Sequence, residues 1–157
     1  MKVIFLDVDG VLNSKEFIMS QHINGKRKGG IIGTSDEMMD RLQTIVKESG
    51  AIIVMSSSWR GGFMAGNEHF EKNITKPFAK RNMFITDITP RDRNMERGLE
   101  IKAWLDKHPE VERFIILDDE EFDIHEHYPK QLVKTDWKIG LQDQHVELAL
   151  IKLNKAR

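Results

Sequence analysis

Short apolar runs alternate with longer amphipathic stretches along the chain. Five runs have the length and the β-branched or aromatic composition of strands, namely residues 3–6, 52–55, 83–86, 114–117 and, less clearly marked, 131–135. The first run is apolar throughout, as in a strand that is buried on both faces of a parallel sheet. The alternation predicts an α/β fold: a single Rossmann-like three-layer domain with a mainly parallel five-stranded sheet.

Helical periodicity marks three of the amphipathic stretches. Thr34 and Glu37 match a capping box that begins a helix, and Gly50 supplies its stop. Two further helices are predicted over residues 98–108 and 142–153, where apolar side chains recur on one helical face. We expect these helices to pack on the sheet and form the outer layers.

Two segments are less regular. Residues 14–33 contain Asn-Gly and Gly-Gly dipeptides, which predict a small hairpin or flap. Residues 61–82 suit a helix with loops that begins after Asn67 and is interrupted by Pro77. The sequence contains no repeat, low-complexity tract or interdomain linker, so we treat residues 1–157 as one domain with a small insertion at about 14–33.

Composition limits the classes of protein and of metal site. The 157 residues are 39% hydrophobic and 31% charged, which is typical of a compact globular domain. Cysteine is absent, so disulfides and thiolate metal sites are excluded and any metal must bind oxygen or imidazole. The formal net charge of -1 argues against broad nonspecific attraction to nucleic acid, and a local basic patch stays open.

Targeting signals are not found in the sequence. The apolar run before Asp7 is too short for a signal peptide, and no stretch reaches membrane-spanning length. We therefore expect a cytoplasmic protein with no membrane partner.

Polar residues follow the predicted strands where each run ends. Asp7 and Asp9 follow the first run, Ser56 follows the second, and Asp118 and Asp119 follow the fourth. Ligands of open α/β sheets bind beyond the carboxyl ends of the strands, so we expect these side chains to meet. Four carboxylates at one edge repel each other unless a cation lies among them, and Mg²⁺ prefers carboxylates with water. We infer a magnesium site; the alternative is that each acidic cluster is solvated separately.

Three motifs resemble signatures of the haloacid-dehalogenase-like (HAD) superfamily. FLDVDGVLN is similar to the first signature, IIVMSSSWR to the second and FIILDDE to the fourth, and they occur in the family's order. The third signature is a Lys or Arg near the start of the helix before the fourth strand; Arg97 and Lys102 both meet this description, and we favour Arg97. The resemblance implies a phosphatase, because phosphatases and phosphomutases of the superfamily carry Asp at the place of Asp9, whereas its dehalogenases do not. Members of the superfamily choose substrates largely through cap insertions, and this chain leaves little room for one, so we expect a minimal cap.

The roles that the resemblance implies agree with the needs of phosphoryl transfer. Asp7 would attack phosphorus and form an aspartyl-phosphate, and Asp9 would protonate the leaving oxygen and then act as base on the hydrolytic water. The resemblance also implies that the backbone carbonyl of Asp9 binds Mg²⁺. Ser56 would hydrogen-bond a phosphoryl oxygen, and Arg97 or Lys102 would offset negative charge there.

The Asp118-Asp119 pair completes the expected metal site together with Asp7 and Asp9. At least one member of the pair would bind the metal directly, and the sequence leaves open which of them does so. The first and fourth strands must then be neighbours in the sheet, since their acids share one cation.

Three residues after the second strand, Ser57, Trp59 and Arg60, are candidates for substrate binding, since an indole can stack on a base and a guanidinium can bind phosphate. The motifs SSSWR, RGLEIKAWL and LDDE further resemble the small phosphatase domains associated with RNA-repair proteins. We therefore expect a nucleotide or a nucleic-acid terminal phosphate as substrate, with a small-metabolite phosphatase as the nearest alternative. A receiver-like signalling module and a non-catalytic phosphoryl-binding relative are the remaining hypotheses. No obligatory protein partner is inferred.

Overall fold

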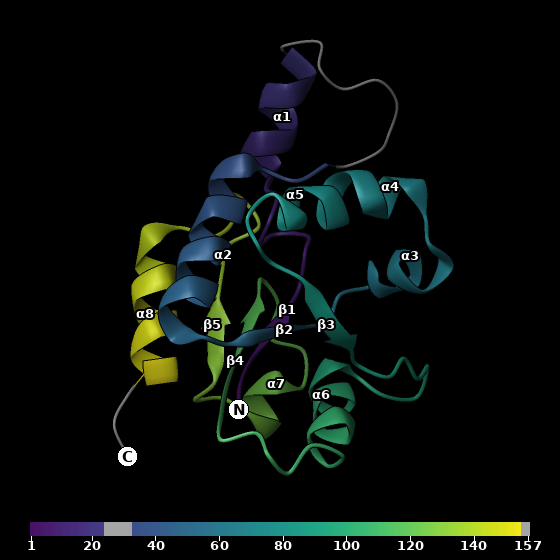
Figure 1. Cartoon of the computed structure of the whole chain (residues 1–157), viewed down its shortest axis with the longest axis vertical. Coiled ribbons are helices and arrows are strands. Elements are labelled where there is room, and N and C mark those ends of the chain that lie inside the picture. Colours follow the sequence, from purple (N-terminus) through teal and green to yellow (C-terminus); the bar gives the residue numbers. More distant parts are fainter. Residues whose placement is uncertain (24–32, 155–157) are drawn as a thin grey trace.

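The computed structural model describes residues 1–23 and 33–154. At its centre lies a five-stranded sheet in the order β3-β2-β1-β4-β5, in which all neighbouring strands run parallel (Figure 1). The strands are β1 (Lys2–Leu6), β2 (Ile52–Met55), β3 (Ile85–Ile88), β4 (Arg113–Asp118) and β5 (Leu132–Lys134). The predicted α/β class and Rossmann-like sheet are therefore confirmed.

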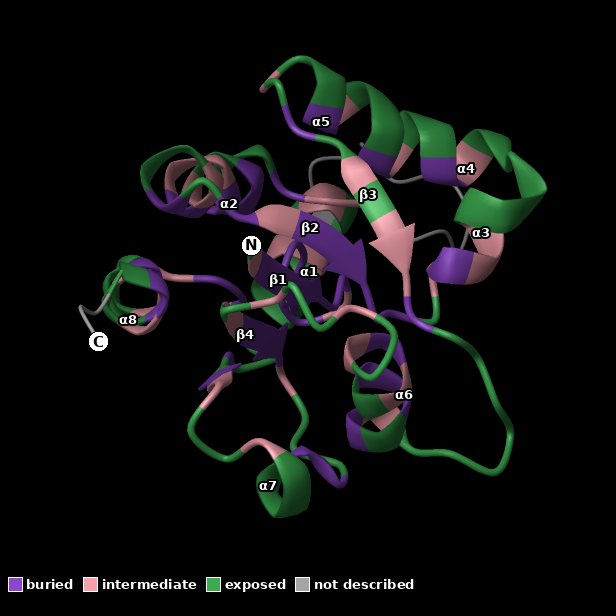
Figure 2. Cartoon of the chain, turned by 60° about the horizontal axis from the view of Figure 1, so that its bottom comes forward, coloured by how far each residue is buried: buried purple, intermediate pink, exposed green. Residues whose placement is uncertain are grey.

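Helices cover both faces of this sheet. They are α1 (Lys15–Ile23), α2 (Asp36–Ser49), α3 (Arg60–Ala65), α4 (Glu68–Phe70), the π-helical turn η1 (Glu71–Thr75), α5 (Lys76–Ala79), α6 (Arg97–Leu105), α7 (Ile124–His127) and α8 (Asp143–Asn154). Figure 2 shows α2 and α8 on one side of the strands and α6 on the other. Alternate residues of β1 serve the two faces, since Ile4 and Leu6 belong to one buried core cluster and Val3 and Phe5 to the other.

The order of the strands reverses between β1 and β4. The chain runs outward from β1 through β2 to β3 and then returns to β4 on the other side of β1. Leu6 is paired with Leu117, and the Asp7 amide donates to the Leu117 carbonyl at 2.9 Å. The next residues, Asp7 and Asp118, therefore lie side by side, at the place where open α/β sheets bind ligands. The expectation that the first and fourth strands are neighbours is confirmed.

The structure corrects two local predictions. β3 begins at Ile85 rather than at residue 83, because Met83 is buried in the core before the strand begins while Phe84 is 70% exposed. The N-cap of α2 is Ser35, whose hydroxyl accepts from an amide of the first turn, and not Thr34. Gly50 ends this helix as predicted.

The insertion after β1 begins as a helix. α1 covers Lys15–Ile23, where the sequence pattern predicted part of a hairpin or flap. The Asn-Gly and Gly-Gly dipeptides on which that prediction depends lie outside the described residues.

The helical segment after Asn67 continues through Pro77 instead of being interrupted by it. α4 leads into η1, and α5 follows directly. Pro77 has no amide hydrogen to offer the Asn73 carbonyl, and the Thr34 hydroxyl donates to that carbonyl at 2.7 Å. Just before the proline the helix widens into the π-helical turn, in which the Lys76 amide donates to the Glu71 carbonyl five residues back.

The longest of the described helices, α2, has 14 residues. A helix that crosses a bilayer needs about 20 mostly apolar residues. Within residues 1–23 and 33–154, no helix combines that length with that apolar character.

Candidate active site

Three carboxylates form a cluster at the carboxyl edge of the sheet. Asp7 follows β1, Asp118 ends β4 and Asp119 comes next. One oxygen from each carboxylate lies within 4.8 Å of the others. Gly10 lets the two segments approach, because its φ is +79° and a Cβ there would lie 2.4 Å from the Asp119 carboxylate. Asp7 and Asp118 are buried, and Asp119 is partly buried.

Arg97, the first residue of α6, contacts this cluster. Its Nη1 donates to Asp118 Oδ2 and lies 3.2 Å from Asp7 Oδ1. Its Cζ lies 4.9 Å from the centroid of the Phe122 ring, which adds a cation–π contact. Phe122 has a φ of +43°, a left-handed conformation that is rare for a bulky residue and that clusters at functional sites. Arg97 is therefore held between acidic and aromatic partners.

A carboxylate from another segment fixes the start of α6. Asp123 accepts from the Gly98 amide with Oδ1 and from the Leu99 amide with Oδ2, the latter at 3.0 Å. A Cβ at Gly98 would lie 2.8 Å from Asp123 Oδ1, so this contact requires a glycine. Amides of the first helical turn have no partner within the helix, and Asp123 supplies a charged one. This contact positions Arg97.

Crowding shifts the pKa values of the cluster. Burial and the charge of Asp7 raise the pKa of Asp118 to about 7, although Arg97 opposes the shift. Burial and Asp7 likewise raise the pKa of Asp119 to about 6. Burial lowers the pKa of Arg97, but the charges of Asp118 and Asp7 together outweigh burial and raise it. The cluster thus holds more negative charge than one guanidinium can balance.

The donor set fits a magnesium ion. Mg²⁺ takes oxygen ligands, usually carboxylates together with water, and Asp7, Asp118 and Asp119 would supply its protein oxygens. A cation here would relieve the repulsion that raises the pKa of Asp118. The side chain of Asp9 does not belong to this group of oxygens. The prediction of Asp9 as a ligand therefore depends on its backbone carbonyl.

Two donors hold the carboxylate of Asp9 in place. Asn13 Nδ2 donates to Oδ1 at 2.9 Å, and Trp59 Nε1 donates to Oδ2 at 3.1 Å. Asn13 also accepts from the Gly10 amide at 2.9 Å and donates to the Gly33 carbonyl at 3.1 Å. These bonds fix the orientation of Asp9 within the loop that follows β1.

The predicted residues after β2 have different surroundings. Ser56 is fully buried, and its hydroxyl has no hydrogen-bond partner in the described part of the chain. The Ser57 hydroxyl accepts from the Trp59 amide at 3.2 Å. The centroids of the Trp59 and His69 rings lie 5.1 Å apart, and the indole N–H of Trp59 donates to Asp9.

Arg60 is buried in an ion pair. Its Nη2 donates to both carboxylate oxygens of Glu100, at 3.0 and 2.9 Å. Its Nη1 donates to the Ser56 carbonyl at 3.0 Å and to the Thr89 hydroxyl at 2.6 Å. Burial lowers the pKa of Arg60, with Glu100 acting against the shift. Both terminal nitrogens of this predicted substrate contact are therefore occupied by bonds that join β2, β3 and α6.

Lys102 is not brought to the cluster. Its ammonium group pairs with Asp106 on the same helix at 2.7 Å, and its side chain is 49% exposed. Of the two basic residues that the sequence left open, Arg97 alone contacts the carboxylates.

The sequence analysis gave no role to Asn13, Glu100 or Asp123. Asn13 is the last residue of the first motif, directly after Val11 and Leu12, and this polar residue next to the acidic pair was the signal in the sequence; the structure shows that it is fully buried. Glu100 and Asp123 act through contacts with segments distant in the chain, for which no local pattern exists.

Comparison with models of known protein families gave a match. Residues 3–146 match the family model described as the HAD domain in Swiss Army Knife RNA repair proteins. A search of curated proteins and a search of solved structures gave no match. The matched range covers most of the chain and contains the three carboxylates, Asp9 and Arg97. The chain therefore belongs to the family of HAD domains found in Swiss Army Knife RNA repair proteins.

Proposed function

We propose that the protein is a Mg²⁺-dependent phosphomonoester hydrolase that works through an aspartyl-phosphate intermediate. Membership of a HAD family favours a hydrolase of the phosphatase type. The observation that carries the proposal is the meeting of Asp7, Asp118 and Asp119 within 4.8 Å, in contact with Arg97. A nucleophile, a metal site and a fixed cation are what phosphoryl transfer requires in one place.

In the first step, a carboxylate oxygen of Asp7 attacks phosphorus while the bond from phosphorus to the leaving oxygen breaks. Asp9 gives its proton to that oxygen, so the product leaves as an alcohol. In the second step, water attacks the phosphorus of the aspartyl-phosphate, Asp9 takes a proton from the water, and the bond to Asp7 breaks. Inorganic phosphate leaves, and Asp9 is again protonated.

The transferred group would be stabilised by neighbouring charges and donors. Arg97 already contacts Asp7, which places a guanidinium beside the attacking oxygen. The unpartnered hydroxyl of Ser56 supports its role as a donor to a phosphoryl oxygen. Asp7, Asp118 and Asp119 would hold Mg²⁺, which when bound would offset the charge of the phosphoryl oxygens.

For the substrate we propose a nucleotide or the terminal phosphate of a nucleic acid. The description of the matched family places such domains in RNA repair proteins, which supports this choice. A phosphorylated small metabolite is the alternative, and no protein partner is required by the proposal.

The test is hydrolysis of 4-nitrophenyl phosphate with Mg²⁺ or with EDTA. We expect EDTA and Asp7→Asn each to lower kcat by about a thousandfold or more, since each removes a part of the covalent step. In Asp9→Asn, the phosphorylated protein should accumulate and be seen by mass spectrometry, because the second step lacks its base. Asp106→Asn, which changes an exposed carboxylate outside the cluster, is the matched control. Equal turnover by the wild type, Asp7→Asn and Asp9→Asn would contradict the proposed mechanism.

A second assay addresses the substrate. We expect kcat/KM to be higher for mononucleotides or for oligonucleotides phosphorylated at one end than for free sugar phosphates. The opposite preference would favour the small-metabolite alternative.

A further inference from the structure

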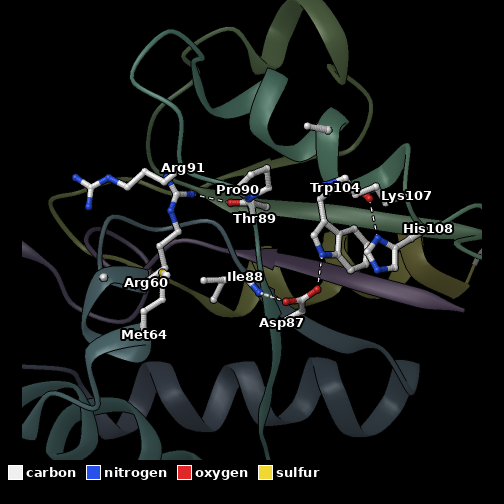
Figure 3. A pocket seen from close by; sticks show the side chains of 12 residues that line it. Arg60, Met64, Asp87, Ile88, Thr89, Pro90, Arg91, Trp104, Lys107 and His108 are labelled. Carbon is white, nitrogen blue, oxygen red and sulfur yellow. Dashed lines mark hydrogen bonds between the residues drawn. The ribbon is translucent and has the colours of Figure 1, made fainter.

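A second pocket, separate from the carboxylate cluster, lies between α3, β3 and α6. It has a volume of about 400 Å³ (Figure 3). Ile88 and Pro90 of the β3 segment and Ala103 and Trp104 of α6 supply apolar walls. His108 stacks on Trp104, with ring centroids 3.6 Å apart and planes at 11°. Trp104 is only 4% exposed, so His108 and Pro90 are the accessible flat surfaces in front of it. The size falls in the range of small-ligand pockets, about 300–1,000 Å³, and these surfaces suit a flat apolar group.

The acidic and neutral polar side chains of this pocket already have hydrogen-bond partners within the protein. Asp87 is the one acidic residue among the described residues of the lining, and it accepts from Trp104 Nε1 at 2.7 Å and from the Ile88 amide at 2.8 Å. The Thr89 hydroxyl accepts from Arg60, whose charge is balanced by Glu100. Both donors to Asp87 are neutral, so its negative charge remains, whereas the charge of Arg60 is balanced by Glu100.

The remaining charged groups of the lining are basic. Arg91 and Lys107 are exposed and form no ion pair with any residue of the described ranges. His108 Nδ1 donates to the Trp104 carbonyl at 2.7 Å, because a carbonyl can only accept, so Nε2 is left for a ligand. The pocket therefore joins an apolar aromatic wall to unpaired positive charge, which complements a flat ring that carries an anion.

The pocket lies next to the proposed reaction centre. Arg60, at one end of the pocket in Figure 3, donates to the carbonyl of Ser56 at 3.0 Å. Arg97 and Ala103 belong to the same helix, and a rise of 1.5 Å per residue separates them by about 9 Å along its axis. This separation is short enough for one substrate to reach both places.

We propose that this pocket binds a nucleotide unit of the substrate, with the base against His108 and Pro90, in front of the buried Trp104, and with its phosphates at Arg91 and Lys107, which lie toward opposite ends of the pocket (Figure 3). The inference deepens the proposed function, on which it rests, by assigning a place for the part of the substrate that does not react. The unit is either one nucleotide of a strand or a nucleotide that carries a second phosphate, since the phosphate held in this pocket is not the one that reacts at Asp7.

Binding can be located with the tryptophan side chains. The protein has three Trp, and their indole ¹H–¹⁵N signals can be assigned with Trp→Phe variants. We expect adenosine 5′-monophosphate, added to the full chain in EDTA, to shift the Trp104 signal, and ribose 5-phosphate to leave it unmoved because it has no base. A 5′-phosphorylated dinucleotide that shifts the signal where the mononucleotide does not would identify a strand as the source. No shift of Trp104 with either nucleotide, or an equal shift with ribose 5-phosphate, would overturn the proposal.

Matched variants test the basic groups. Arg91→Ala combined with Lys107→Ala should weaken nucleotide binding at Trp104 by about tenfold or more, since charge-assisted contacts are lost. Arg91→Ala alone should also weaken binding, whereas Arg93→Ala, which removes the same single charge from the same loop but lies outside the pocket lining, should leave binding as in the wild type. An equal loss in Arg93→Ala would mean that general charge, and not the pocket, attracts the ligand.

The two proposals fail separately. Turnover of 4-nitrophenyl phosphate tests the reaction without engaging a base, whereas the Trp104 shift is measured without Mg²⁺ and without turnover. If the protein hydrolyses 4-nitrophenyl phosphate but the Trp104 signal does not shift, the pocket proposal is wrong and the phosphatase proposal stands. If the signal shifts but no hydrolysis is found, the phosphatase proposal is wrong and nucleotide binding in the pocket stands.

Discussion

At the scale of single residues, Gly10 controls how closely the β1 loop and the end of β4 can approach. Its φ of +79° is disfavoured for residues with a side chain, and a Cβ would lie 2.4 Å from atoms of the Asp119 carboxylate. The Thr135 hydroxyl also donates to the Gly10 carbonyl at 2.6 Å, so the backbone cannot easily move away. A side chain at this position must therefore displace Asp119.

We predict that Gly10→Ala impairs both folding and metal binding. Gly50 is the matched control, because its φ is +70° and no atom of the described residues lies within 4 Å of an added Cβ. Gly50→Ala should cost about 1 kcal/mol from backbone strain alone, whereas Gly10→Ala should cost more and should abolish the stabilisation by Mg²⁺. Denaturant unfolding with and without Mg²⁺ measures both effects. A Gly10→Ala protein that keeps the full Mg²⁺ response would contradict the geometry.

Helical phase explains why Arg97 and Lys102 have different surroundings. Five residues turn an α-helix by about 140°, so two residues with this spacing cannot share a face. Ile101 and Trp104 are buried against the sheet, and Lys102 turns toward solvent. The sequence contained enough information to separate the two residues, since the apolar positions of α6 define its buried face.

At the scale of elements, the start of α6 depends on a carboxylate that does not belong to the helix. Asp123 accepts from the amides of Gly98 and Leu99, and the residue before the helix, Glu96, makes no side-chain cap. The same first turn carries Arg97. A change at Asp123 should therefore alter the position of Arg97 and, with it, the proposed reaction centre.

We predict that Asp123→Ala lowers the free energy of unfolding by about 1–2 kcal/mol and also lowers kcat, because the helix loses its capping acceptor. Asp123→Asn keeps one acceptor oxygen, so its free energy of unfolding and its kcat should both lie between those of the wild type and of Asp123→Ala. Asp106→Ala, at the exposed end of the same helix, should change stability by less than about 0.5 kcal/mol. Denaturant unfolding and phosphatase kinetics supply the measurements. Equal stability of Asp123→Ala and Asp106→Ala would show that the cap contributes nothing.

Some elements of the fold could be predicted from the sequence and others could not, and the difference has physical causes. β1 and β4 are continuous apolar runs followed by acids, so both the strands and the meeting of Asp7 with Asp118 could be predicted. β3 was displaced by two residues, because Met83 is apolar for reasons of core packing and not of strand pairing. The capping role of Asp123 depends on tertiary contact, which no local pattern encodes.

At the scale of the whole molecule, the carboxylate cluster links stability to pH. The folded protein holds a pKa of about 7 at Asp118 and about 6 at Asp119, and the usual value for aspartate is about 3.9. Between these values the folded state binds more protons than the unfolded state. The free energy of unfolding therefore falls as pH rises through this window.

We predict that the metal-free protein loses stability between about pH 4 and pH 7 and that excess Mg²⁺ reverses much of the loss, since a cation favours the ionised carboxylates. Asp118→Asn should flatten the decline. Unfolding free energies measured across this range in EDTA and in Mg²⁺ test the prediction. A metal-free stability that increases with pH would contradict it.

The central place of β1 has a consequence for biosynthesis. The strand lies between β2 and β4, and a chain made from its N-terminus completes β1 long before β4. A metal can therefore bind carboxylate oxygens of all three residues only after Asp118 and Asp119 have been translated. A nascent chain halted before Asp118 carries the proposed nucleophile without the rest of the proposed metal site, so the proposed activity should begin on the ribosome only after the fourth strand has emerged.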